Sequence, residues 1–249
     1  MRRLFLTAFL LFGFNFLLWS NCSEKNPLAT IEIKPEPPEF PFFDLVLPEK
    51  FVQSRDTVAQ MALKNLRIAD SVNVFRNLLL MPDSTTTFAR RSEMDAWASI
   101  RRLDTLTISV YLAERTDGIN AWLIVLDGIY NGESIDSMNY INARHFRKKQ
   151  GESYHSVRLE TLTPVGRRRD YWYWDFWDNG SITISLNLEN DDIYVSIFYH
   201  ADLSGRIQLT SGGGQQGDYH GYNIDWEADG SGYWEKYDYK LEIVETGQW

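Results

Sequence analysis

Residues 181–188 read Ser-Ile-Thr-Ile-Ser-Leu-Asn-Leu, and this strict alternation of polar and apolar residues decides the fold class. Successive side chains of a β-strand point to opposite faces, so the four aliphatic residues share one face and the polar residues the other. The stretch therefore predicts a strand with one face in a hydrophobic core and one face in water.

The same period of two extends from residue 104 to the C-terminus. It predicts about ten strands, at 105–115, 121–130, 138–147, 153–162, 170–177, 181–188, 192–200, 205–210, 219–227 and 232–245. Short turns such as Asp117-Gly118 and Asp229-Gly230 separate them, and such turns join antiparallel neighbours. The sequence predicts a mainly β fold: an antiparallel barrel-like or curled sheet, or a sandwich. Alternation does not choose among these architectures.

One long helix is predicted before the strands. Over 55–80, apolar residues recur at intervals of three and four, with Ser54 as the expected N-cap and Pro82 as the stop. Such a helix has one apolar stripe, and we expect the stripe to pack on the sheet. A shorter helix is expected over 92–101, with acidic residues near its start and basic residues at its end.

The N-terminus has the features of a secretory signal. Arg2 and Arg3 precede a nearly apolar stretch from Leu4 to Trp19. A helix of that length reaches about 24 Å, which is less than the ~30 Å of a hydrocarbon core. The stretch therefore indicates a signal peptide rather than a stable membrane span.

Cys22 is the only cysteine of the 249-residue chain, so it has no partner for an internal disulfide. The segment Leu18-Trp19-Ser20-Asn21-Cys22 resembles the lipobox of bacterial lipoproteins. This resemblance implies that Cys22 is acylated and anchors the mature chain to a membrane, and that Ser23 favours the outer membrane. Ordinary secretion and an uncleaved anchor are the alternatives.

Composition divides the chain into four segments. Six of the eight prolines lie between Pro27 and Pro48, which indicates an extended spacer without helix or central strand. The expected organisation is a signal peptide at 1–21, a lipid anchor and Pro-rich spacer at 22–50, a helical segment at 51–103 and an antiparallel β domain at 104–249.

The charge pattern excludes general nucleic-acid binding and marks one basic region. The formal net charge is −9, whereas nucleic-acid binding needs a basic surface. Basic residues gather in one region of the chain: Arg144, Arg147, Lys148, Lys149, Arg158, Arg167, Arg168 and Arg169. They could dock on anionic lipid or an acidic partner, or balance the acidic residues of their own domain.

Seven consecutive residues, Tyr171-Trp172-Tyr173-Trp174-Asp175-Phe176-Trp177, form an unusually aromatic strand. Alternation places Trp172, Trp174 and Phe176 on one face, and the remaining aromatic rings on the other. If one face is left exposed, it is a platform for sugar rings or a small amphiphile, with Asp175, Asp178 and Asn179 as hydrogen-bond partners. The alternative is that both faces are covered.

Two weaker motifs complete the candidate sites. Asp225, Glu227 and Asp229, followed by Gly230, match the first half of a calcium loop, but Lys236 stands where such a loop needs a glutamate. An ordinary hairpin turn is the alternative. Residues 211–217 are rich in glycine and lie between strands, so we expect a hairpin loop there rather than a phosphate site.

A search for catalytic groups finds little. The chain has no Gly-x-Ser-x-Gly or His-Glu-x-x-His motif, and its four histidines, at 145, 155, 200 and 220, show no ligand-like spacing. His145 and His155 flank an expected hairpin and could approach each other. We therefore predict a non-enzymatic, membrane-tethered binding or structural lipoprotein without a cofactor. The alternatives are a glycan hydrolase using Asp175, Asp178 or Asp225, and an interaction protein using the basic hairpin.

Overall fold

The computed structural model describes residues 37–80, 86–91, 94–130, 132–163, 169–188, 193–211 and 220–249. All the described elements belong to one compact unit, Pro37–Trp249. Cys22, the lipobox, Arg167, Arg168 and residues 212–217 lie outside the described residues.

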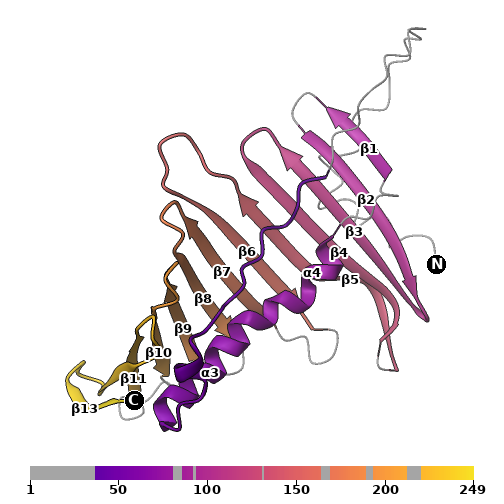
Figure 1. Cartoon of the computed structure of the whole chain (residues 1–249). Helices are drawn as coiled ribbons and strands as arrows, with labels where there is room; N and C mark the ends of the chain where they lie inside the picture. Colours follow the sequence, from indigo (N-terminus) through magenta and orange to yellow (C-terminus); the bar gives the residue numbers. More distant parts are fainter. Residues whose placement is uncertain are drawn as a thin grey trace, which may run out of the picture. The chain divides into compact units, whose positions relative to one another are not determined.

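All the described strands form one antiparallel sheet in which the spatial order equals the sequence order (Figure 1). The strands are β1 Thr86–Arg91, β2 Met94–Leu103, β3 Leu106–Arg115, β4 Ile119–Tyr130, β5 Glu133–Phe146, β6 Tyr154–Leu162, β7 Arg169–Trp177, β8 Ile182–Leu188, β9 Ile193–Tyr199, β10 Gly205–Ser211, β11 His220–Trp226, β12 Gly232–Tyr237 and β13 Ile243–Gln248. Short connections force each strand to pair with the next one, which makes every pairing antiparallel.

The prediction of a mainly β fold is confirmed, but its details change. Within the described residues the sheet has 13 strands rather than about ten, and it is open, because β1 and β13 are its two ends. It is therefore neither a closed barrel nor a sandwich of two sheets. One predicted strand, 232–245, is two strands, β12 and β13, joined by a turn at which the Leu241 amide donates to the Asp238 carbonyl over 3.0 Å.

The prediction of one long helix over 55–80 is wrong. The segment contains α3 Thr57–Asp70, the 3-10 helix η1 Ser71–Phe75 and α4 Arg76–Leu79, after a short α2 Glu49–Val52. Asp56 rather than Ser54 caps α3, since its Oδ1 accepts from the Val58 and Ala59 amides at 2.8 Å. The α-helix ends where the Ser71 hydroxyl bonds the Ile68 carbonyl at 2.6 Å, a contact that competes with regular helical hydrogen bonding.

The helix expected over 92–101 is also wrong, because β2 occupies this part of the chain. β2 pairs with β3 along its whole length, and its Trp97 is buried in the core. Arg101 of β2 donates to the carbonyls of Asn77, at 2.8 Å, and Leu80, and so satisfies the C-terminal end of α4. Tertiary pairing therefore overrides the local helical pattern, and the sheet begins well before residue 104.

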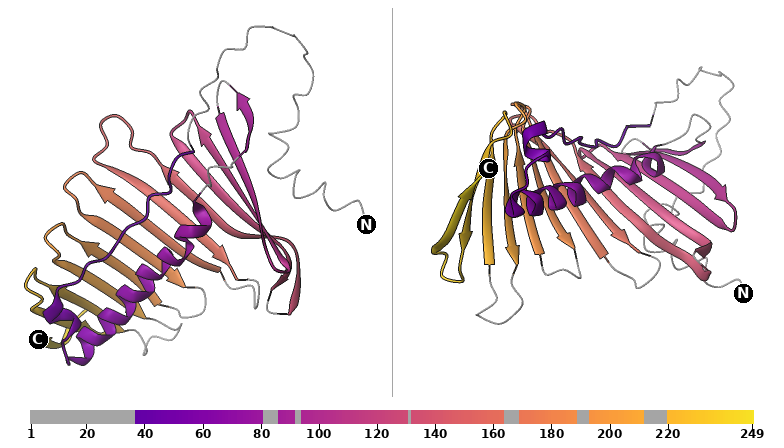
Figure 2. Two further views of the ribbon diagram at one scale, coloured as in Figure 1. Left: turned by 45° about the vertical axis from the view of Figure 1, so that its right-hand side comes forward. Right: turned by 60° about the horizontal axis from the view of Figure 1, so that its bottom comes forward.

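Residues 37–48, the strap, were expected to be part of a spacer, and they instead pack on the sheet. Figure 2 shows the strap crossing the strands beside α3 in both views. Its carbonyls accept hydrogen bonds from core side chains: Trp174 Nε1 to Pro41 at 3.2 Å, and Tyr199 Oη to Val46 at 2.8 Å. Prolines prevent this segment from forming a strand or helix, but they do not prevent it from burying phenylalanines.

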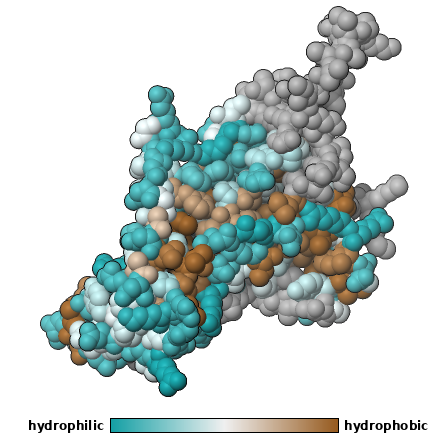
Figure 3. All heavy atoms as spheres, viewed as in Figure 1, coloured by the Kyte–Doolittle hydropathy of each residue, from teal (hydrophilic) through white to brown (hydrophobic). Residues whose placement is uncertain are grey.

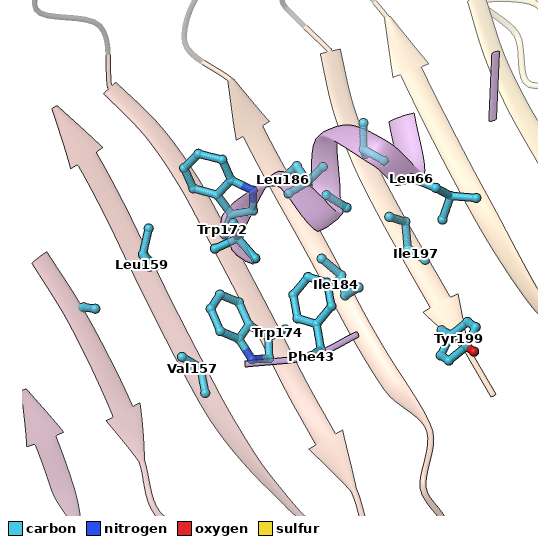
Figure 4. Packing of buried hydrophobic residues seen from close by; sticks show 14 of the residues in the cluster. Phe43, Leu66, Val157, Leu159, Trp172, Trp174, Ile184, Leu186, Ile197 and Tyr199 are labelled. Atoms are coloured by element: carbon cyan, nitrogen blue, oxygen red, sulfur yellow. The ribbon is translucent and has the colours of Figure 1, made fainter. Parts of the chain in front are cut away.

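The hydrophobic core lies between the sheet and the layer formed by the strap and α3. Phe43 and Leu66 point toward Trp174, Ile184 and Ile197 of the sheet (Figure 4). Hydrophilic residues cover the exposed side of α3, with hydrophobic residues gathered beside it (Figure 3). No helix in the described part of the chain is both long and apolar enough to cross a bilayer.

Phe43→Ala tests whether the strap is part of the folded unit. The Phe43 side chain is 1% exposed and its ring centre lies 5.3 Å from that of Trp174, so we expect a loss of about 3–5 kcal/mol in the free energy of unfolding, measured by urea denaturation. Val46→Ala, in the same strap at 59% exposure, is the control and should change stability by less than about 0.5 kcal/mol. Equal stability of both variants would contradict the docking of the strap.

Candidate functional site

The face of the sheet opposite α3, the outer face, carries the candidate site. Residues directly opposed in an antiparallel pair share a face. Their register makes one row of Arg144, Arg158, Tyr173 and Ser185, and a second row of Asn142, Glu160, Tyr171, Asn187 and Tyr194. The residues between these rows, such as Trp172 and Leu186, are buried on the α3 side. Both rows therefore belong to the outer face.

These two rows line a groove of about 640 Å³ across β5 to β9, hereafter the outer groove. Three tyrosines line it: Tyr171, Tyr173 and Tyr194. Neutral hydrogen-bonding side chains line it as well: Asn142, Ser185 and Asn187. Four strand spacings give the groove a width of about 19 Å, and aromatic rings beside a few polar groups are typical of ligand sites.

Two arginines of the outer groove face each other without a described acidic partner. Arg144 of β5 and Arg158 of β6 are direct cross-strand neighbours. Within the described residues, neither guanidinium has a carboxylate in ion-pair range, whereas the nearby Glu160 pairs with Arg169 at 3.6 Å. Like charges in opposed positions destabilise a sheet, so this pair costs stability in the empty protein.

Aromatic stacking holds Arg158 in place. Its guanidinium carbon lies 5.3 Å from the Phe146 ring centre and 5.2 Å from that of Tyr173. Tyr173 donates to Ser156 Oγ at 3.2 Å, and Ser156 in turn donates to the buried Asp175 at 2.5 Å. Burial and the neighbouring Asp175 raise the pKa of Tyr173, so its phenol keeps its proton and remains a donor.

The predicted aromatic residues divide between the two faces as their alternation indicated. Trp172 and Trp174 are 5% and 0% exposed and belong to the core. Tyr171 and Tyr173 line the outer groove. Trp177 is on the same face at the end of β7, where its Nε1 donates to Thr183 Oγ1 at 2.9 Å. Of the aromatic residues predicted to bind a ligand, the two tyrosines therefore line the outer groove with partly exposed rings, whereas Trp172 borders it while buried in the core.

Three of the six described basic residues of the basic region pair with the protein's own acids. Arg147 pairs with Glu114, and Lys148 pairs with Asp178 at 2.6 Å. With the Arg169–Glu160 pair, these contacts favour the interpretation that the hairpin balances its own domain. The side chain of Lys149 is exposed, and the remaining two described basic residues, Arg144 and Arg158, line the outer groove.

The acidic residues of the calcium motif do not gather around one point. Asp225 pairs with Arg206 at 2.7 Å on the outer face. Asp229 accepts from the Ser231 amide and hydroxyl at 2.8 and 2.6 Å inside the turn, as an ordinary hairpin does, and Glu227 is exposed. Over the described ranges, no cluster of three or more acidic, histidine or cysteine side chains is arranged to hold a metal ion.

His145 and His155 do meet, on the α3 side of the sheet. His145 Nε2 and His155 Nδ1 lie 3.0 Å apart, while the other ring nitrogen of His145 is buried without a partner. The residue opposite His145 is Asn120, whose Oδ1 is also buried without a partner. Burial, followed by the charges of His155 and Arg147, lowers the pKa of His145 to about 4, so this imidazole is neutral at pH 7.

Sequence reasoning missed Arg158 as a partner of Arg144, and it missed Asn142, Ser185, Asn187 and Tyr194. A signal was present, because alternation places each of them on the polar face of its strand. The missing information was register: only the pairing of β5 to β9 shows which of these residues stand side by side.

We expect the protein to lose stability as the pH falls from 6.5 toward 4. The folded pKa of His145 is about 4 and its ordinary value is 6.5, so in this range the unfolded chain binds more protons than the folded one. The stabilisation is complete above pH 6.5 and is lost as the pH falls through the folded pKa. His145→Phe should flatten this slope in urea denaturation, whereas the same change at the exposed His200 should not. An unchanged slope in His145→Phe contradicts the assignment.

Comparisons with known proteins do not assign a function to this site. No protein-family model, curated protein or solved structure matches this chain. The exposed tyrosines, the strand register and the two facing arginines of the outer groove are therefore the observations from which a function is inferred.

Proposed function

We propose that this protein is a non-enzymatic binding protein, anchored to the bacterial envelope through an acylated Cys22, that binds saccharides in the outer groove. The observation that carries the proposal is a sheet face without a described covering element, bearing exposed tyrosines around a groove. Tyrosine rings offer flat apolar faces to sugar rings, and the neighbouring amides and hydroxyls hydrogen-bond sugar hydroxyls.

The exposure of the aromatic residues supports a binding role for this face. Tyr171 and Tyr194 are 38% and 51% exposed although each stands in the interior of the sheet. Their neighbours across the strands are Glu160 and Asn187, which are polar. A small amphiphile is a less suitable ligand, because amides, hydroxyls and guanidiniums surround the rings.

The carboxylates favour binding over glycan hydrolysis. Asp175 is buried and bound to Ser156, and Asp178 is paired with Lys148. Asp225 stands four strands from Asp175 in the same row, a separation of about 19 Å, whereas hydrolases hold two carboxyls about 5–9.5 Å apart.

Tyr171→Ala tests the binding proposal. For a tetrasaccharide that the wild-type protein binds, we expect at least about tenfold weaker binding in isothermal titration calorimetry, since the variant loses one of the three tyrosine rings that line the groove. Tyr111→Ala is the matched control: Tyr111 is 37% exposed on the outer face of β3, outside the groove and two strands from its edge residue Asn142, and its loss should not change affinity.

A panel of neutral and acidic tetrasaccharides makes this experiment decisive. Binding that is weakened equally by both variants would place the ligand elsewhere on the sheet. No heat with any saccharide at millimolar concentration would remove the proposal.

Cys22→Ser tests the anchor separately from the ligand. Because acyl chains contribute about 0.8 kcal/mol per buried CH₂, we expect the variant to leave the membrane fraction of the producing cells. Mass spectrometry of the wild-type protein should show acyl groups on an N-terminal Cys22. A wild-type Cys22 without acyl groups would disprove the anchor while leaving the saccharide proposal intact.

A further inference from the structure

We infer that the outer groove is specific for acidic saccharides, in which an anionic group of the sugar lies between Arg144 and Arg158. This inference rests on the proposed function and adds to it the charge of the ligand. The binding chemistry is a carboxylate or sulfate on a sugar ring, held by two guanidiniums while the ring stacks on a tyrosine.

The first argument is charge. The chain has a formal charge of −9, and several arginines on its surface pair with an acidic neighbour, among them Arg147, Arg169 and Arg206. Arg144 and Arg158 have none among the described residues, and they repel each other across β5 and β6. An anion between them removes the repulsion and satisfies both guanidiniums, which makes the pair complementary to a negative ligand.

The second argument is preorganisation. Phe146 and Tyr173 flank the Arg158 guanidinium, and the hydrogen bonds from Tyr173 through Ser156 to Asp175 hold the tyrosine. The flat guanidinium therefore has a set orientation before the ligand arrives. A planar fork of donors held in this way binds a carboxylate or sulfate through two hydrogen bonds and loses little side-chain entropy.

The third argument concerns the rest of the ligand. Beyond the arginines, the outer groove continues across β7 to β9 with Tyr171, Asn187 and Tyr194, which are neutral. A lipid headgroup would fill the arginine end and leave these residues unused, and a membrane surface would demand further cations in the same plane. An acidic saccharide would place its anionic group between the arginines and its hydroxyl-bearing rings beside these neutral side chains. A saccharide is therefore the occupant.

Calorimetry with tetragalacturonate, a sulfated tetrasaccharide, neutral chitotetraose and phosphatidylglycerol vesicles tests the inference. We expect the acidic ligands to bind at least about tenfold more tightly than the neutral one, and this preference to shrink as salt is raised. Arg144→Gln and Arg158→Gln should each weaken acidic binding about tenfold or more and leave neutral binding within about twofold. The preferred acidic tetrasaccharide identifies the anionic group.

Arg102→Gln is the matched control, since Arg102 is an exposed arginine on the outer face of β2. It removes the same charge and should leave the affinity unchanged. A similar loss in Arg102→Gln would show a general charge effect and overturn the inference. Circular dichroism melting of each variant verifies the fold. Arg144→Lys keeps the positive charge but loses the planar guanidinium, so partial binding by this variant supports the inference.

The two proposals fail in different ways. Equal binding of neutral and acidic tetrasaccharides, unchanged by Arg144→Gln and Arg158→Gln, would overturn the acidic specificity and leave the saccharide function standing. Binding to anionic vesicles but to no tetrasaccharide would overturn both, in favour of a membrane surface. Absence of binding by all four probes would also overturn both.

Discussion

A single-layer sheet has two faces, and the described chain covers only one of them. The strap, α2 and α3 lie on one side, where phenylalanines of the strap meet tryptophans from β4 and β7, and Phe51 of α2 meets the tryptophan of β11. Burial of these large rings stabilises the fold, because apolar area removed from water is the dominant favourable contribution to folding. The other face must therefore remain compatible with water.

This asymmetry explains why the candidate site lies where it does. Tyr171 and Tyr173 alternate with Trp172 and Trp174 along β7, so one strand supplies both the centre of the core and the wall of the outer groove. Core packing on the α3 side fixes the backbone of β7, and the backbone fixes the tyrosines. A binding surface built in this way is rigid, which reduces the entropy lost when a ligand binds.

The pattern of polar and apolar residues predicted the antiparallel β architecture and the division of the aromatic strand between two faces. It failed where tertiary contacts decided the structure. Residues 92–101 look helical by their charges, yet from Met94 onward β3 provides a continuous partner strand. The prolines of the strap are typical of a spacer, yet its phenylalanines pack on a hydrophobic surface that only the folded sheet provides. Neither contact is encoded within a short window of sequence.

The sequence by itself determined which residues of each strand face the core and which face water, because that choice follows from a period of two. It also predicts a lipid anchor at Cys22, through the resemblance of the segment that ends there to a lipobox. Only the tertiary structure decided which outward-facing residues are neighbours. Arg144 and Arg158 are fourteen positions apart in the chain and become a facing pair through the register of β5 and β6. Register depends on the packing of the whole sheet, since a shift of one residue would turn every side chain to the opposite face.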